Sequence, residues 1–189
     1  MIDVNNYPIL KNNMSTLKET SKDDHNGVAS YMTDSEVEAI NFDNVKNDYV
    51  LSLSLSEPPK SNDALFINSP ELATFIEFKN GYFDKAKEFA VRKKVYDSIL
   101  ILNDIIDKNI TFSRNHLDYI LVYNESKNPD AKTSYSASES RDFIDKTLLG
   151  FGNDRLIKFG LERFQGYCFK NVYTYTEKEF QENFINSIT

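Results

Sequence analysis

The chain contains one cysteine and two histidines, and both shortages exclude classes of site. Cys168 cannot form an internal disulfide, no thiolate metal-site spacing is present, and we interpret the residue as a buried apolar one. This cysteine usage is typical of a reducing compartment, so we expect a cytoplasmic protein. His25 and His116 show no ligand spacing, which argues against a zinc site or a histidine-based hydrolase.

Long hydrophobic runs are missing as well. The longest apolar cluster, residues 96–106, is too short and too interrupted to cross a bilayer. The first 13 residues are acidic and rich in amides, whereas a signal peptide would be basic and then apolar. We therefore expect no membrane partner. The two glycines of residues 150–154, "GFGND", lack the Gly-Lys-Ser/Thr of a nucleotide-binding loop.

Basic residues are fewer than acidic ones over the whole chain, but one segment has a local excess of positive charge. A formal net charge of −7 argues against a general nucleic-acid coat. Between residues 79 and 94, however, six basic residues stand against two acidic ones. Such an island suits a local surface facing phosphates, although a solvated helix face balanced by nearby acids would explain it equally well. The candidate nucleic-acid-binding residues are Lys85, Lys87, Arg92, Lys93 and Lys94.

The apolar periodicity predicts an α/β (mixed α+β) domain, with a central mixed sheet of about four to five strands flanked by helices. Residues 1–32 lack sustained periodicity, so we expect a loose N-terminal arm followed by a single domain over residues 33–189. The expected elements are a helix over 33–47, strands near 49–57, 63–68 and 74–79, a helix over 84–109, a strand over 116–125, a loop over 126–138, a helix over 138–151, a strand over 167–176 and a closing helix over 176–188.

Three charged residues mark the hairpin expected over residues 63–79. Glu77 and Lys79 share one strand face because side chains alternate along a strand. Asp63 joins that face if it pairs with either residue across a five-residue connection, whereas a slip by one residue would turn it away. Two carboxylates and an ammonium group suit metal-assisted phosphodiester hydrolysis, since carboxylates bind Mg²⁺ and a lysine can orient the attacking water. An ordinary surface ion pair would have the same spacing.

These residues also carry a family resemblance. Asp63, the stretch "FIEFKNG" at residues 75–81, the basic helix and the strand "YILVYN" resemble the PD-(D/E)xK nuclease superfamily, also called the restriction-endonuclease-like fold. The resemblance covers residues 33–125 and implies that Asp63 and Glu77 bind Mg²⁺ or Mn²⁺ while Lys79 assists the attacking water. It also implies an acidic ligand from the first helix, for which Glu38 is the candidate and Glu36 the next. One departure from the family pattern is Asn62, which stands where many members have proline.

The resemblance implies a divalent-metal-dependent nuclease, with DNA favoured over RNA as the substrate and defence against foreign DNA among its roles. The superfamily also contains catalytically silent members, so a module of the same fold that binds a protein or nucleic acid is the alternative. A third hypothesis is an acidic, immunity-type decoy that occupies the nucleic-acid-binding surface of a partner. A short separation between the carboxylates of Asp63 and Glu77, with Lys79 beside them, is what the first hypothesis requires.

Overall fold

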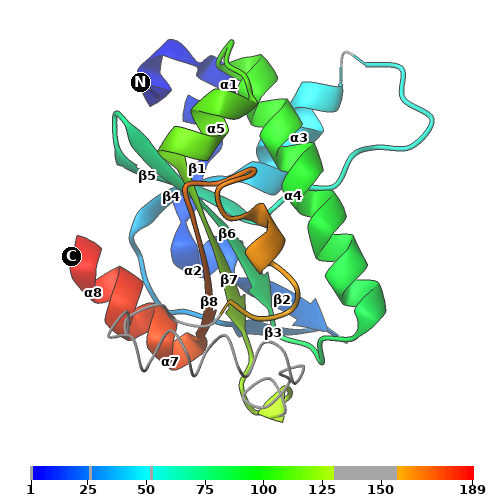
Figure 1. The fold of residues 1–189 in the computed structure, drawn as a ribbon, viewed down its shortest axis with the longest axis vertical. Helices are drawn as coiled ribbons and strands as arrows, with labels where there is room; N and C mark the ends of the chain where they lie inside the picture. Colours follow the sequence, from blue (N-terminus) through cyan, green and yellow to red (C-terminus); the bar gives the residue numbers. More distant parts are fainter. Residues whose placement is uncertain (1, 26, 52, 130–156) are drawn as a thin grey trace.

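The computed structural model describes residues 2–25, 27–51, 53–129 and 157–189. Within these ranges a six-stranded mixed sheet has the order β1-β4-β5-β6-β7-β8, and β2 and β3 form a separate antiparallel pair (Figure 1). The strands are β1 (Met14–Thr16), β2 (Lys22–His25), β3 (Val28–Tyr31), β4 (Glu38–Asn41), β5 (Ala64–Ser69), β6 (Leu72–Lys79), β7 (Leu117–Tyr123) and β8 (Asn171–Thr176). The predicted mixed α/β class is confirmed.

Helices cover both faces of this sheet. One face packs against α3, α4 and α5, and the other against α2 and the C-terminal helical segment (Figure 1). The longer helices are α3 (Phe42–Val50), α4 (Lys85–Ile105) and α5 (Ile110–His116). The shorter ones are η1 (Val4–Asn6), α1 (Pro8–Lys11), α2 (Leu17–Thr20), η3 (Glu162–Phe164), α7 (Glu177–Phe180), the π-helical turn η4 (Gln181–Ile185) and α8 (Asn186–Ile188).

The sheet changes direction at β6. Strand β6 is antiparallel to β5 and parallel to β7, and α4 lies between β6 and β7 in the chain. Because side chains alternate along β6, Phe75 belongs to the core under α4, whereas Ile76 and Phe78 belong to the core under α7. Glu77 and Lys79, in phase with Phe75, are therefore on the α4 side of the sheet.

Helix α4 forms where the periodicity predicts it. Asp84 caps its start by accepting a hydrogen bond from the backbone nitrogen of Lys87 at 2.8 Å. Val95, Ile99 and Leu102 are buried against the sheet as expected, whereas Phe89 is 71% exposed. The apolar stripe that anchors the helix therefore begins beyond its first turn.

The N-terminal segment is not a loose arm. Strand β1 pairs with β4, with Met14 opposite Ile40, and the side chains of Leu10 and Leu17 are fully buried. The expectation failed because a strand as short as β1 shows no periodicity of its own. Strand β1 forms because it pairs with the edge of β4, and this partner is distant from it in the sequence.

The region after the arm also differs from the sequence prediction. The predicted helix over 33–47 is replaced by strand β4 and then by α3, which Asn41 caps by accepting a hydrogen bond from the backbone nitrogen of Asn44 at 3.0 Å. The predicted strand near 49–57 is wrong, and Leu51, Leu53 and Leu55 are exposed. Alternating residues form a strand only when they pair with another strand, and the described residues of this segment pair with none.

The later elements follow the prediction more closely. Strand β7 starts at Leu117, because residues 110–116 form α5, and β8 starts at Asn171. The closing helical segment has the predicted capping box between Thr176 and Glu179. The predicted helix over 138–151, the "GFGND" segment and most of the loop over 126–138 lie outside the described residues. In the described part of the chain, every helix is too short or too polar to cross a bilayer.

We predict that Leu10→Ala lowers the free energy of unfolding by about 2–5 kcal/mol, because it removes a fully buried side chain and leaves a cavity. Chemical denaturation followed by circular dichroism measures this change. The control Leu51→Ala, at a position that is 83% exposed, should change the free energy of unfolding by less than about 0.5 kcal/mol. Equal effects of the two substitutions would mean that the N-terminal segment does not belong to the core.

Candidate active site

The hairpin of β5 and β6 sets the position of the three predicted residues. Ala64 pairs with Ile76, so Asp63, immediately before β5, lies beside Glu77. This is one of the two registers that the sequence allows. The hairpin closes between Ser69 and Leu72 after an irregularity in β5, so the connection is shorter than the predicted five residues.

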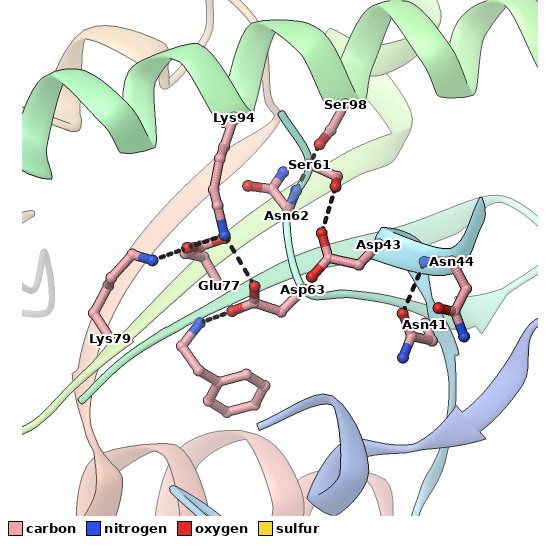
Figure 2. A network of polar contacts seen from close by, with 11 residues as sticks. Asn41, Asp43, Asn44, Ser61, Asn62, Asp63, Glu77, Lys79, Lys94 and Ser98 are labelled. Atoms are coloured by element: carbon pink, nitrogen blue, oxygen red, sulfur yellow. Dashed lines mark hydrogen bonds and ion pairs between the residues drawn. The ribbon is translucent and has the colours of Figure 1, made fainter. Parts of the chain in front are cut away.

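Asp63, Glu77 and Lys79 come together, and Lys94 of α4 joins them (Figure 2). The ammonium group of Lys94 donates to Asp63 Oδ1 at 3.0 Å and to Glu77 Oε1 and Oε2 at 2.7 and 3.0 Å. Lys79 Nζ lies 2.5 Å from Glu77 Oε1. The other oxygen of Asp63, Oδ2, accepts a hydrogen bond from the backbone nitrogen of Phe78 at 2.6 Å. We call these four charged residues the charged cluster.

Burial decides the electrostatics of the charged cluster. The side chain of Glu77 is 0% exposed, whereas those of Asp63, Lys94 and Lys79 are 15%, 19% and 24% exposed. Burial, and then the charge of Asp63, raises the pKa of Glu77, while the two ammonium groups oppose this shift. For Lys94, burial favours the neutral amine, but the carboxylates of Glu77 and Asp63 outweigh it and raise the pKa. Lys94 is therefore charged at neutral pH.

Neither Glu38 nor Glu36 lies on a helix, whereas Asp43 lies on α3. Glu38 lies exposed on β4, and Glu36 forms an ion pair with Lys18 at 3.4 Å. Asp43 lies in the first turn of α3, and its Oδ1 accepts a hydrogen bond from Ser61 Oγ at 2.5 Å, close to Asp63 (Figure 2). The capping pattern of Asn41 could have placed the start of this helix, and with it Asp43, from the sequence.

A cavity of about 310 Å³ lies beside the charged cluster. Its lining includes Asp43, Asp63, Lys79 and Lys87, together with N-terminal residues from Thr20 to Asp23. Asn80 Nδ2 fastens the β2–β3 pair next to the end of β6 by donating to Asp23 Oδ2 and Ser30 Oγ, both at 3.1 Å. Sequence reasoning missed this wall because it treated residues 1–32 as an arm.

The predicted basic surface is largely paired within the protein. Lys94 belongs to the charged cluster, Lys93 donates to Glu57 at 2.7 Å, and Arg92 lies 3.6 Å from Glu88. The two remaining candidates, Lys85 and Lys87, are exposed, and Lys87 lines the cavity while donating to the carbonyl of Tyr82 at 2.7 Å. A charge count along residues 79–94 could not reveal the acidic partners of Lys93 and Lys94, because Glu57, Asp63 and Glu77 lie outside that segment.

The donor set is compatible with a magnesium-type ion, provided that Lys94 gives way. Mg²⁺ commonly uses one or two carboxylates and completes its shell with water and substrate phosphate. Asp63 and Glu77 supply two, although no group of three His, Cys, Asp or Glu side chains gathers as a metal site in the described ranges. Asn62, next to Asp63, is fully buried, and neither its Oδ1 nor its Nδ2 has a hydrogen-bond partner among the described residues. A buried amide without partners is unusual in a folded protein, and a water molecule or an ion bound beside it would satisfy it.

His116 and Cys168 lie outside this site. His116 ends α5, and its Nδ1 lies 2.8 Å from the carbonyl of Glu71. Cys168 is buried, and burial raises the pKa of its thiol to about 11, which disfavours the nucleophilic thiolate. The side chain of His25 lies outside the described residues.

Comparisons of the chain with protein-family models, with curated proteins and with solved structures gave no match. The functional argument therefore depends on the geometry of the charged cluster and of its cavity.

We predict that Glu77→Ala lowers the free energy of unfolding by about 3–5 kcal/mol, because it leaves the largely buried Lys94 with one carboxylate instead of two. Denaturant unfolding at neutral pH measures this effect. Glu57→Ala removes the exposed partner of Lys93 and should cost no more than about 1 kcal/mol. If Glu77→Ala were as mild as Glu57→Ala, the buried ion pairs would not be an important source of stability.

Proposed function

We propose that this protein is a divalent-metal-dependent nuclease that hydrolyses phosphodiester bonds, with DNA as the favoured substrate. The observation that supports this proposal is the convergence of Asp63, Glu77 and Lys79 next to a cavity. Their arrangement matches what the resemblance to the PD-(D/E)xK superfamily implies. A role in defence against foreign DNA belongs to the same proposal.

Asp63 and Glu77 would hold the ion, since their carboxylates are joined through a single bridging cation, Lys94. When bound, the ion would polarise the phosphate and lower the pKa of a water molecule bound to it. The backbone N–H of Phe78 orients the Asp63 carboxylate, because it occupies Oδ2 and leaves Oδ1 for a cation. This fixed carboxylate is the kind of preorganised group that metal-assisted hydrolysis needs.

Lys79 has the position of a group that acts on water or on developing charge. It contacts Glu77 Oε1, it is more exposed than Lys94, and it lines the cavity. Lys87 lines the same cavity and adds a second positive charge. Although the chain has a formal net charge of −7, Lys79 and Lys87 place two positive charges at this cavity, where they would attract phosphate.

The alternative function is a catalytically silent module that binds nucleic acid or a protein. One observation favours it: Lys94 already occupies the space between the two carboxylates that an ion would share. A permanently neutralised cluster would keep the fold and the cavity without the metal. The two functions differ in whether chelator-sensitive cleavage is present.

Lys79→Ala should lower the cleavage rate by about a hundredfold or more without weakening Mn²⁺ binding, because this lysine stabilises the transition state and is not a ligand. Glu77→Gln should lose both cleavage and metal binding. The assay incubates each variant with linear and circular, single- and double-stranded DNA and with RNA, in Mg²⁺, in Mn²⁺ and with chelator. Lys178→Ala, which removes an 81% exposed lysine on α7, is the control and should cleave like the wild type.

Two results would count against this proposal, the first against the nuclease activity and the second against the assigned residues. Absence of chelator-sensitive cleavage on every substrate favours the binding module. Cleavage that survives in both Lys79→Ala and Glu77→Gln would place the chemistry at other residues.

A further inference from the structure

Lys94 holds a place that differs from that of every other lysine near the site. Its Nζ lies within 3.0 Å of three carboxylate oxygens, which belong to Asp63 before β5 and to Glu77 on β6. Among the described residues, Lys79 forms an ion pair with Glu77 and none with Asp63. A cation shared by Asp63 and Glu77 must lie between their carboxylates, and the ammonium group of Lys94 lies there (Figure 2).

The charges of the cluster oppose a second cation in the same place. The two carboxylates and the two ammonium groups balance, so the cluster has no excess negative charge while Lys94 stays. A divalent ion would bring two more positive charges into a site where Glu77 has no exposure to water. Like charges at such distances repel strongly in a poorly solvated environment, so ammonium and ion exclude each other.

Buried contacts anchor helix α4 around Lys94, whereas the Lys94 side chain is long and partly exposed. Val91 and Val95, on the same helical face, are fully buried, and Ser98 Oγ accepts a hydrogen bond from the backbone nitrogen of Asn62 at 2.8 Å. These contacts hold α4 against the start of β5. The Lys94 side chain has four rotatable carbon–carbon bonds and is 19% exposed, so it can swing outward without moving the helix.

The geometry points to Lys94 as the resident cation of the Asp63–Glu77 site, which a divalent ion must displace in order to bind. This inference rests on the proposed function in taking a divalent ion as the ligand. Lys94 then sets how tightly the site holds its ion, and it is a positioning residue that need not touch the substrate. The neutral cluster keeps Glu77 compensated when no ion is bound.

The test is a Mn²⁺ titration of the wild type, Lys94→Met and Lys93→Met by calorimetry, with thermal melting recorded on the same samples. Lys94→Met keeps the length of the side chain and removes its charge, so it should bind Mn²⁺ at least about tenfold more tightly than the wild type. Its melting temperature should be lower than that of the wild type without metal and should rise more with Mn²⁺. Lys93→Met removes the same charge one residue away, where the partner is the exposed Glu57, and should stay within about twofold of the wild type.

A second measurement uses the unaltered protein. Acetylation of lysine amines, read by mass spectrometry, reports how accessible Lys94 is. Saturating Mn²⁺ should increase labelling of Lys94 severalfold relative to Lys93, since the displaced side chain loses both carboxylate partners. This measurement does not depend on the stability of Lys94→Met.

The outcomes separate this inference from the proposed function. Mn²⁺ binding by Lys94→Met but not by the wild type supports the competition and contradicts the metal-dependent nuclease. Refolding of an unfolded Lys94→Met by Mn²⁺ also supports it. Equal or weaker binding by a folded Lys94→Met overturns the inference. A variant that remains unfolded in Mn²⁺, together with unchanged labelling of the wild type, overturns it as well.

Discussion

The structure depends on a buried carboxylate, that of Glu77. A carboxylate without exposure to water is strongly unfavourable unless cations and hydrogen-bond donors compensate it. Lys79 comes from the same strand, but Lys94 must come from α4, so the compensation fixes the helix to the sheet. Lys94 also reaches Asp63, which ties the start of β5 into the same cluster. One set of ion pairs thus joins two strands and the crossover helix at the site.

The nuclease and its alternative, the binding module, both depend on that ion-pair network. As a nuclease, the protein would use the two carboxylates for an ion and Lys79 for the water, with the cavity as the approach for phosphate. As a binding module, it would keep the ion pairs and use the cavity alone. The position of Lys94 distinguishes these descriptions, because a single ammonium group decides whether the carboxylates are open to an ion.

Much of the site could be predicted from the sequence, but its most informative member was misplaced. Strand alternation put Glu77 and Lys79 on one face, and the observed register brings Asp63 beside them. The local charge count predicts that Lys94 belongs to a phosphate-facing surface, whereas the structure places it between Asp63 and Glu77. The helical period predicts that Lys94 lies close to the buried face of α4. Val91 precedes it by three positions, Val95 follows it directly, and Ser98 follows it by four positions; all three are buried. A cationic residue inside an apolar stripe predicts a buried acidic partner, although not which acid.

The sequence by itself determined the local features: the mixed α/β class, the β5–β6 hairpin, the Asp84 cap of α4 and the Thr176 capping box. These depend on alternation, helical period and hydrogen bonds within a few residues, which a single segment contains. The tertiary structure decided that β1 pairs with β4, that Asp43 of α3 lies near Asp63, and that Lys94 lies between Asp63 and Glu77. Strand-edge pairing and charge compensation join groups far apart in the chain, so their partners become defined only when the whole domain has packed.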